Sequence, residues 1–306
     1  MFRYLIIGLT LIFCSAALMA GYSINTDIPA DSAYIDSVVQ LTHDRLTRIY
    51  DRIPDDTLEI YMVTSEEKFD QVAAGNVPDW GAAVAIPYRK KIVIKSPLIL
   101  PGDKSLGELV AHEYAHIALA RRVGYRTVPR WLNEGLSMYV SAEWGWNDNL
   151  SIGIAVITGA TVPLPDIERL NSFSQDRAAT AYSQSYLAVV YFLETYGESS
   201  LRLILDNIRD GKDIDYAFIT AIGTDCEDFE REFNIYLSGR YNLIAVIFNS
   251  NILWLMLAVI VIVGFLMHRL RRRKRFEDMD RYDQLHSTDF DYGAGVEKPD
   301  EDKPWD

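Results

Sequence analysis

The spacing of hydrophobic and polar residues divides the chain into a mixed first third and a helical remainder. Apolar side chains recur at helical spacing over residues 31–52, and they alternate with polar ones over 57–63, as in a strand. A short helix suits residues 66–74. Two further strands, at 81–86 and 91–95, flank a turn that contains proline. The first third therefore predicts a small sheet with helices packed on it.

The rest of the chain predicts helices almost throughout. One helix runs over 105–122 and stops at Gly124, and the next begins after Pro129. Residues 144–161 are rich in Gly and Asn without a clear period, which predicts a loop. Helical patterns follow at 179–196, 199–210, 213–222 and 225–239. Strands followed by helices indicate an α+β domain with a helical C-terminal half, rather than alternating βαβ units.

Two apolar segments suggest where the chain is located. Residues 1–20 have a basic start, an apolar run and a small-residue end, the layout of a secretory signal peptide. Residues 248–267 are almost wholly apolar, and about 20 helical residues span roughly 30 Å, the thickness of a bilayer core. The basic cluster at 269–275 marks the cytoplasmic side. A signal that is cleaved and one that is retained as an anchor predict the same orientation.

The predicted domain organisation follows from these segments. Residues 21–242 form an extracytoplasmic domain, and 268–306 form a basic stop followed by an acidic cytoplasmic tail. The tail from residue 276 onwards carries 11 acidic residues against three basic ones and few aliphatic ones, which predicts disorder. Once the signal is cleaved, the chain is expected to be a single-pass membrane protein whose extracytoplasmic domain lies close to the bilayer.

Composition and charge narrow the function classes. The 306 residues are 49% hydrophobic and 24% charged, which excludes a disordered or collagen-like chain. The formal net charge is −13, and residues 21–266 contribute 32 acidic against 20 basic side chains, a balance of −12. Such an acidic body does not attract phosphate backbones, so no nucleic-acid partner is expected.

The candidate chemistry lies in the helix at 105–122, which contains His112-Glu113-Tyr114-Ala115-His116. Side chains four apart share a helix face, so both imidazoles can reach one metal ion. Glu113 projects beside them, placed to take a proton from water. This is the HExxH pattern of zinc hydrolases, although chance alone gives its three fixed letters in roughly one chain in a hundred.

A zinc site of this kind needs a third protein ligand. Of the other histidines, His268 and His286 lie at or beyond the inner membrane face and His43 is on a distant predicted helix, which leaves a carboxylate. Glu134 follows His116 after 17 intervening residues, enough for a turn and a return helix.

The motif pair resembles a known superfamily. HExxH followed by Trp-Leu-Asn-Glu-Gly at 131–135 resembles the gluzincin zinc metallopeptidases, which include thermolysin and aminopeptidase N, and most closely their small bacterial peptidase-MA-like members. The resemblance implies a zincin-like fold and one Zn²⁺ per chain. It also implies that His112, His116 and Glu134 are the metal ligands and that Glu113 is the general base.

The same resemblance implies further site residues. Tyr182 matches the tyrosine that stabilises the oxyanion in the aminopeptidases, although Gln184-Ser185 stands where those enzymes have Lys-Gly. Tyr186, four residues on and facing the same way, is a second candidate for this tyrosine and for substrate contact. Trp80, Gly81 and Ala82 begin a stretch that resembles the edge strand lining the cleft of the smaller family. An edge strand can pair with an extended peptide.

These observations predict a membrane-anchored zinc endopeptidase that acts on protein or peptide substrates near the bilayer. The amine-binding Gly-x-Met-x-Asn motif of the aminopeptidases is missing, which favours internal cleavage. Two alternatives remain open from the sequence: a zinc-binding sensor or binding module without catalysis, and a zinc hydrolase of a non-peptide substrate.

Overall fold

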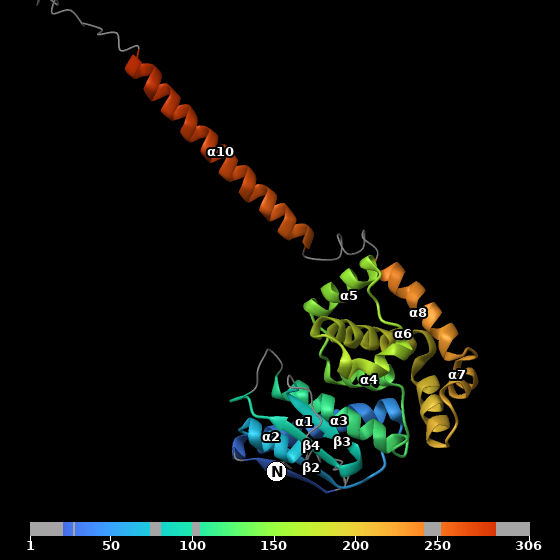
Figure 1. Cartoon of the computed structure of the whole chain (residues 1–306). Helices are drawn as coiled ribbons and strands as arrows, with labels where there is room; N and C mark the ends of the chain where they lie inside the picture. Colours follow the sequence, from blue (N-terminus) through green and yellow to red (C-terminus); the bar gives the residue numbers. More distant parts are fainter. Residues whose placement is uncertain (1–20, 27, 74–80, 100–104, 242–251, 286–306) are drawn as a thin grey trace, which may run out of the picture. The chain divides into compact units, whose positions relative to one another are not determined.

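The computed structural model describes residues 21–241 and 252–285, apart from 27, 74–80 and 100–104 (Figure 1). The chain divides into two compact units, Met1–Ile244 and Ala245–Asp306, which are described separately. The first unit contains the sheet, the two motif helices and the candidate site. The predicted signal peptide at 1–20 lies outside the described residues.

A four-stranded mixed sheet forms one part of the first unit. Its strands are β1 (Tyr22–Thr26), β2 (Leu58–Val63), β3 (Ala83–Ile86) and β4 (Lys91–Lys95), in the order β1-β2-β4-β3. The first three in this order are parallel, and β3 pairs antiparallel with β4 at the edge. A short 3₁₀ helix, η1 (Pro87–Arg89), makes the tight connection from β3 to β4.

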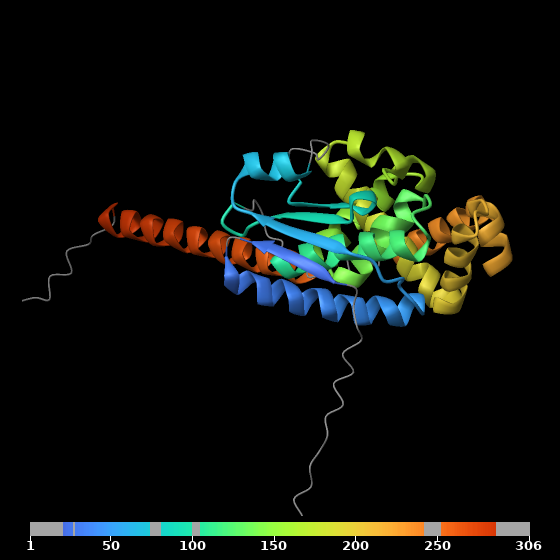
Figure 2. The same ribbon diagram turned by 90° about the horizontal axis from the view of Figure 1, so that it is seen from below.

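The alternation along β2 and β4 explains why helices cover both sheet faces. One face presents paired isoleucines, Ile60 opposite Ile92, and packs with α1 (Pro29–Tyr50) and α3 (Leu106–Arg122). The other face presents Val63 and Val93 to Phe69 of α2 (Glu66–Ala73). Figure 2 shows α1 and α2 on opposite sides of the sheet. β4 buries both faces, so its central residues form a continuous apolar run, whereas β2 exposes Glu59 and keeps the alternation that its sequence shows.

The second half of this unit is helical. The most extensive helix packing here is that of α4 (Arg130–Ser141) against α6 (Gln175–Arg209) and against α3. The long α6 is broken at Gly197, whose φ of 76° and ψ of 171° are not helical, at the residue where the sequence predicts a helix end. The remaining elements are α5 (Trp146–Thr158), η2 (Leu164–Ser172), α7 (Ile214–Ile222) and α8 (Cys226–Arg240). The predicted α+β class is confirmed.

Two elements differ from the sequence-based expectation. The segment at 144–161, predicted as a loop, contains α5. Its start is capped because the Gly145 N–H donates to the Asp148 carboxylate at 2.9 Å, and Ile152 is fully buried. Its Gly and Asn residues therefore stand inside a helix stabilised by burial. The sequence pattern also misses β1, whose five residues expose every second side chain and are held by pairing with β2.

The second unit contains one long helix, α10 (Ile252–Leu285). Within it, Trp254–Phe276 is long and apolar enough to cross a membrane, and none of its hydrophobic window is buried within the structure. This range begins and ends later than the predicted 248–267, of which residues 248–251 lie outside the description. The helix continues to Leu285, so residues 276–285 of the acidic tail are helical where composition predicts disorder.

Candidate active site

The helix that carries HExxH begins with a capping box. Ser105 accepts a hydrogen bond from the Glu108 N–H at 3.2 Å, and the Glu108 carboxylate accepts from the Ser105 N–H at 2.8 Å. Two otherwise unpaired N–H groups are thereby satisfied, which fixes where α3 starts. Glu108 therefore stabilises the helix end on which the site is built.

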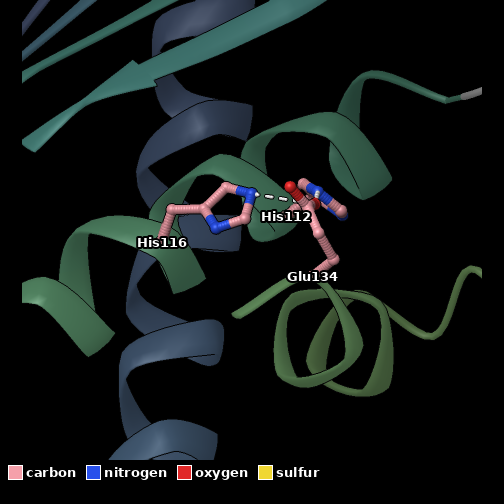
Figure 3. Close-up of side chains that lie close together, drawn as sticks. All are labelled: His112, His116 and Glu134. Carbon is pink, nitrogen blue, oxygen red and sulfur yellow. Dashed lines mark ion pairs between the residues drawn. The ribbon is translucent and has the colours of Figure 1, made fainter. Parts of the chain in front are cut away.

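Three side chains from α3 and α4 converge on one point (Figure 3). The Nε2 atoms of His112 and His116 each lie 3.6 Å from the same oxygen, Oε2 of Glu134. One ligand atom from each residue falls within 4.8 Å of the other two. The spacing of the histidines on α3 and the return of the chain through α4 together create this arrangement, as the sequence predicts.

The other ring nitrogen of each histidine faces a polar partner. Nδ1 of His116 lies 2.8 Å from Asn133 Oδ1 and 3.0 Å from Ser137 Oγ, both on α4. Nδ1 of His112 lies 2.8 Å from a Glu143 oxygen, at ion-pair distance although not aligned as a hydrogen bond. Partners at Nδ1 favour the tautomer that carries its proton on that nitrogen, which makes Nε2 the ligand atom of each ring when a metal binds.

The electrostatics of the three residues are strongly coupled. Burial lowers the pKa of the His112 imidazole, but the nearby carboxylates of Glu143 and Glu134 outweigh it and raise the pKa to about 10. Burial likewise raises the pKa of Glu134, but His116, His112 and Arg130 hold it below its ordinary value. The carboxylates thus favour positive charge at this point, which a protonated imidazole or a bound cation can carry.

A cavity of about 290 Å³ opens beside these residues. Its polar lining includes the buried Glu113 and, from α6, the phenol of Tyr182. Burial and the Glu134 carboxylate raise the pKa of Tyr182 above its ordinary value. The phenol therefore stays protonated at neutral pH and can donate a hydrogen bond into the cavity. The full lining is Gly81, Ala83, Val84, Ala85, Pro87, His112, Glu113, His116, Arg130, Asn133, Glu134, Asn171 and Tyr182.

A glycine explains why α6 reaches the cavity. An added Cβ at Gly135, the residue after Glu134, would lie 2.2 Å from the Ser185 carbonyl oxygen. The backbones of α4 and α6 therefore touch at this point, which brings Tyr182 to the same cavity as Glu134. Gln184 is buried and exchanges hydrogen bonds with the Val162 backbone at 2.6 and 2.9 Å. Gln184 and Ser185 thus have packing roles.

Of the residues predicted to contact the substrate, some line the cavity and others do not. Gly81 lines the cavity, followed by three residues of the edge strand β3. Ala82 is not part of the lining, and its carbonyl accepts a hydrogen bond from Lys95 of β4. Trp80 lies outside the described residues. Tyr186 is also not part of the lining, because its ring stacks on Trp144 with 4.4 Å between centroids.

The sequence reasoning missed Arg130, Asn133, Ser137 and Asn171. Arg130 has a signal in the sequence, since it stands four residues before Glu134 and its Nε donates to Glu134 Oε1 at 2.8 Å. Asn133 and Ser137 flank Glu134 at positions that return to the α3 side. Asn171 comes from η2 and has no local signal, because its place in the cavity depends on how the chain folds back over α4.

The donor set fits a zinc ion. Zinc prefers imidazole nitrogen and carboxylate oxygen in a tetrahedron, and bonds of about 2.1 Å separate the ligand atoms by about 3.4 Å. The two distances of 3.6 Å from Glu134 to the imidazoles are close to this value. Three protein ligands would leave a fourth position open, as in catalytic rather than structural zinc sites.

A comparison with protein families gives a match. The family model of the peptidase MA superfamily matches residues 33–239, a range that contains every residue lining the cavity. No curated protein matches the chain.

Proposed function

Because the chain belongs to the peptidase MA superfamily, we propose that it is a zinc-dependent endopeptidase anchored in a membrane. His112, His116 and Glu134 bind the metal, and Glu113 is the general base. The observation that carries this proposal is the convergence of the three ligand atoms at one end of a cavity that Glu113 and Tyr182 also line. A binding module would have no need for a base and a hydrogen-bond donor beside the ligands.

The residues divide the chemistry of amide hydrolysis among them. Bound zinc supplies a Lewis acid, which acidifies water and polarises a carbonyl group. Glu113 accepts a proton from the water that attacks the carbonyl carbon, and it returns this proton to the amine nitrogen as the C–N bond breaks. Tyr182, kept protonated by its buried position, donates a hydrogen bond to the oxyanion that forms on the carbonyl oxygen.

The edge strand supports a peptide as the substrate. Among the described residues β3 pairs with β4 along one side only, and Ala83, Val84 and Ala85 line the cavity. An extended peptide can add to such an edge through backbone hydrogen bonds. This mode of binding does not require a free terminus, so we expect cleavage at internal bonds.

The apolar helix supports anchoring in a membrane. Trp254–Phe276 has a mean hydropathy of 1.8, and the basic residues 269–275 at its end favour a cytoplasmic C-terminus. The catalytic domain would then be extracytoplasmic, behind a signal peptide at residues 1–20. Substrates near the bilayer follow from this topology.

The test is cleavage of a mixed peptide library by the purified full chain in detergent, read by mass spectrometry beside the Glu113→Gln variant. We expect internal cuts that only the wild type makes and that a chelator abolishes. Cuts confined to chain ends would contradict the endopeptidase. If a zinc-loaded preparation makes no cut, the peptidase is wrong, and a panel of ester and non-peptide amide substrates then separates a different hydrolase from a sensor.

A further inference from the structure

Arg130 occupies a position that helix energetics disfavour. It is the first residue of α4, where the helix dipole places partial positive charge and favours carboxylates over cations. Its partner Glu134 follows it four residues later, which is the less favourable order for an ion pair on a helix. When a residue that lines a cavity is unfavourable for its own helix in two ways, it usually has a role in the site.

The contacts of Arg130 show what that role is. Its Nε donates to Oε1 of Glu134 at 2.8 Å, while the other oxygen, Oε2, is the one that lies 3.6 Å from each imidazole. The two oxygens of the Glu134 carboxylate therefore have different partners: Oε1 binds the guanidinium, and Oε2 faces the imidazoles. With Oε1 occupied by the guanidinium, Glu134 presents a single oxygen to the point where the three ligands meet.

The guanidinium is itself held from a second element. A terminal nitrogen of Arg130 donates to Asn171 Oδ1 of η2 at 3.0 Å, and the Arg130 backbone N–H donates to Glu168, also of η2, at 2.7 Å. The planar guanidinium suits this arrangement because its donors have fixed directions. η2 thus fixes Arg130, and Arg130 fixes Glu134.

We infer that Arg130 is a positioning residue that holds the Glu134 carboxylate so that one oxygen faces the metal, and that it links η2 to the metal site. The inference rests on the proposed function, since it presumes that His112, His116 and Glu134 bind a metal. Without Arg130, both oxygens of Glu134 are free to turn towards the ion. The coordination number then rises, and the affinity falls because the carboxylate is no longer held in its binding orientation before the metal arrives.

The test uses the full chain in detergent, loaded with Co²⁺ and Zn²⁺, in the wild type and in Arg130→Gln. Zn²⁺ affinity is measured by competition with a chelating dye, and coordination by the intensity of the visible bands of bound Co²⁺, which weaken as coordination number rises. We expect a 10–100-fold loss of affinity in Arg130→Gln, the usual effect of removing a partner of a ligand, together with weaker Co²⁺ bands.

Further variants separate positioning from packing. Arg130→Lys should recover part of the affinity, because an ammonium group can pair with Glu134 but cannot also keep the fixed contact with Asn171. Asn171→Ala should show a smaller loss than Arg130→Gln. The matched control is Arg169→Gln, which removes an exposed ion pair with Asp166 in the same η2 and should leave affinity and spectrum unchanged.

The outcomes are distinguishable. If Arg130→Gln binds Zn²⁺ as tightly as the wild type with the same Co²⁺ spectrum, Arg130 does not position Glu134, even if the variant unfolds at a lower temperature. If Arg169→Gln loses as much affinity as Arg130→Gln, the effect is not specific to Arg130, and the inference is wrong. If the wild type binds neither metal, the proposed function itself fails and this inference fails with it.

Discussion

Helix α3 contributes side chains to two polar clusters that differ in the ratio of carboxylates to cationic groups. The Asp56 cluster, at the C-terminal end of α3, joins Asp56 to Lys90 at 2.7 Å and to Tyr125 at 2.8 Å. Arg121 of α3 donates to the backbone carbonyls of Asp56 and Thr57. The carboxylate has its cation within the cluster, and the contacts fasten the end of α3 to the strand β2 and to the β3–β4 turn.

The cavity cluster, formed by His112, Glu113, His116, Arg130, Glu134 and Glu143, differs in the balance of its charged groups. Three carboxylates face one guanidinium and a pair of imidazoles, and the cluster lines or adjoins a cavity. An excess of buried carboxylate is costly unless a cation is present. The Asp56 cluster therefore fastens the fold, whereas the cavity cluster has groups that could hold a cation, and substitutions in each cluster test this distinction.

Loss of the base should have the largest effect. Glu113→Gln removes a proton acceptor from the cavity cluster while keeping the shape of the side chain, so peptide hydrolysis should fall about 10²–10⁴-fold. Zinc content and melting temperature should stay close to those of the wild type, as measured by elemental analysis and thermal unfolding. A variant with wild-type turnover would show that Glu113 does not transfer the proton.

The contact between α4 and α6 should be the most sensitive packing point near the cavity. In Gly135→Ala the new Cβ meets the Ser185 carbonyl oxygen, so the free energy of unfolding should fall by about 1–3 kcal/mol, as for other overpacked sites. Denaturant unfolding measures the change. Gly239→Ala on α8 is the control: none of the described residues comes within 4 Å of an added Cβ there, and the variant should be unchanged or slightly more stable. Equal effects of the two substitutions would contradict the close approach.

Removing the partner of one histidine should weaken metal binding without unfolding the protein. Glu143→Gln takes a negative charge from beside His112, and we expect zinc affinity to fall about 10–100-fold. Ser137→Ala should cost less, because His116 keeps Asn133 as a partner. Dye competition measures both affinities. A larger loss in Ser137→Ala than in Glu143→Gln would reverse the order that this structure predicts.

Changing the Asp56 cluster should have the smallest effect, and it should appear in stability at low pH. The hydrogen bond from Lys90, against some desolvation and with help from Tyr125, lowers the pKa of Asp56 to about 2. A lowered carboxyl pKa stabilises the folded state above the unfolded pKa of about 4, and this stabilisation is lost as the pH falls from about 4 to 2.

Asp56→Asn should therefore flatten the dependence of unfolding free energy on pH within that window. The carboxylate is partly exposed, so the change should be about 1 kcal/mol or less. Urea unfolding at a series of pH values measures it, and peptide hydrolysis at neutral pH should not change. A loss of activity in this variant would contradict the assignment of the Asp56 cluster to stability alone.

The helical motifs could be predicted from the sequence because they depend on local periodicity. Residues four apart on a helix share a face, so His112 and His116 were placed correctly relative to each other, and Glu134 required only a return helix. The same rule does not carry over to Tyr182 and Tyr186. Four residues advance a helix by about 6 Å, and over that distance α6 passes from the cavity to the stacked ring of Trp144.

The features that sequence reasoning missed depend on tertiary contacts. Asn171 reaches the cavity only because η2 folds back over α4, and no local pattern encodes that path. The helix α5 was missed because its Gly and Asn residues favour loops, yet a cap at Gly145 and the burial of Ile152 stabilise it. The short β1 depends on its pairing with β2.

The measurement that tests the central claim most directly is the zinc content of the purified full chain, determined by elemental analysis for the wild type, Glu134→Ala and Glu113→Gln. The structure predicts about one zinc per chain in the wild type and in Glu113→Gln, and loss of zinc in Glu134→Ala, since Glu134 contributes a ligand atom to the convergent group and Glu113 does not. Zinc retained as tightly in Glu134→Ala as in the wild type would contradict the proposed metal site.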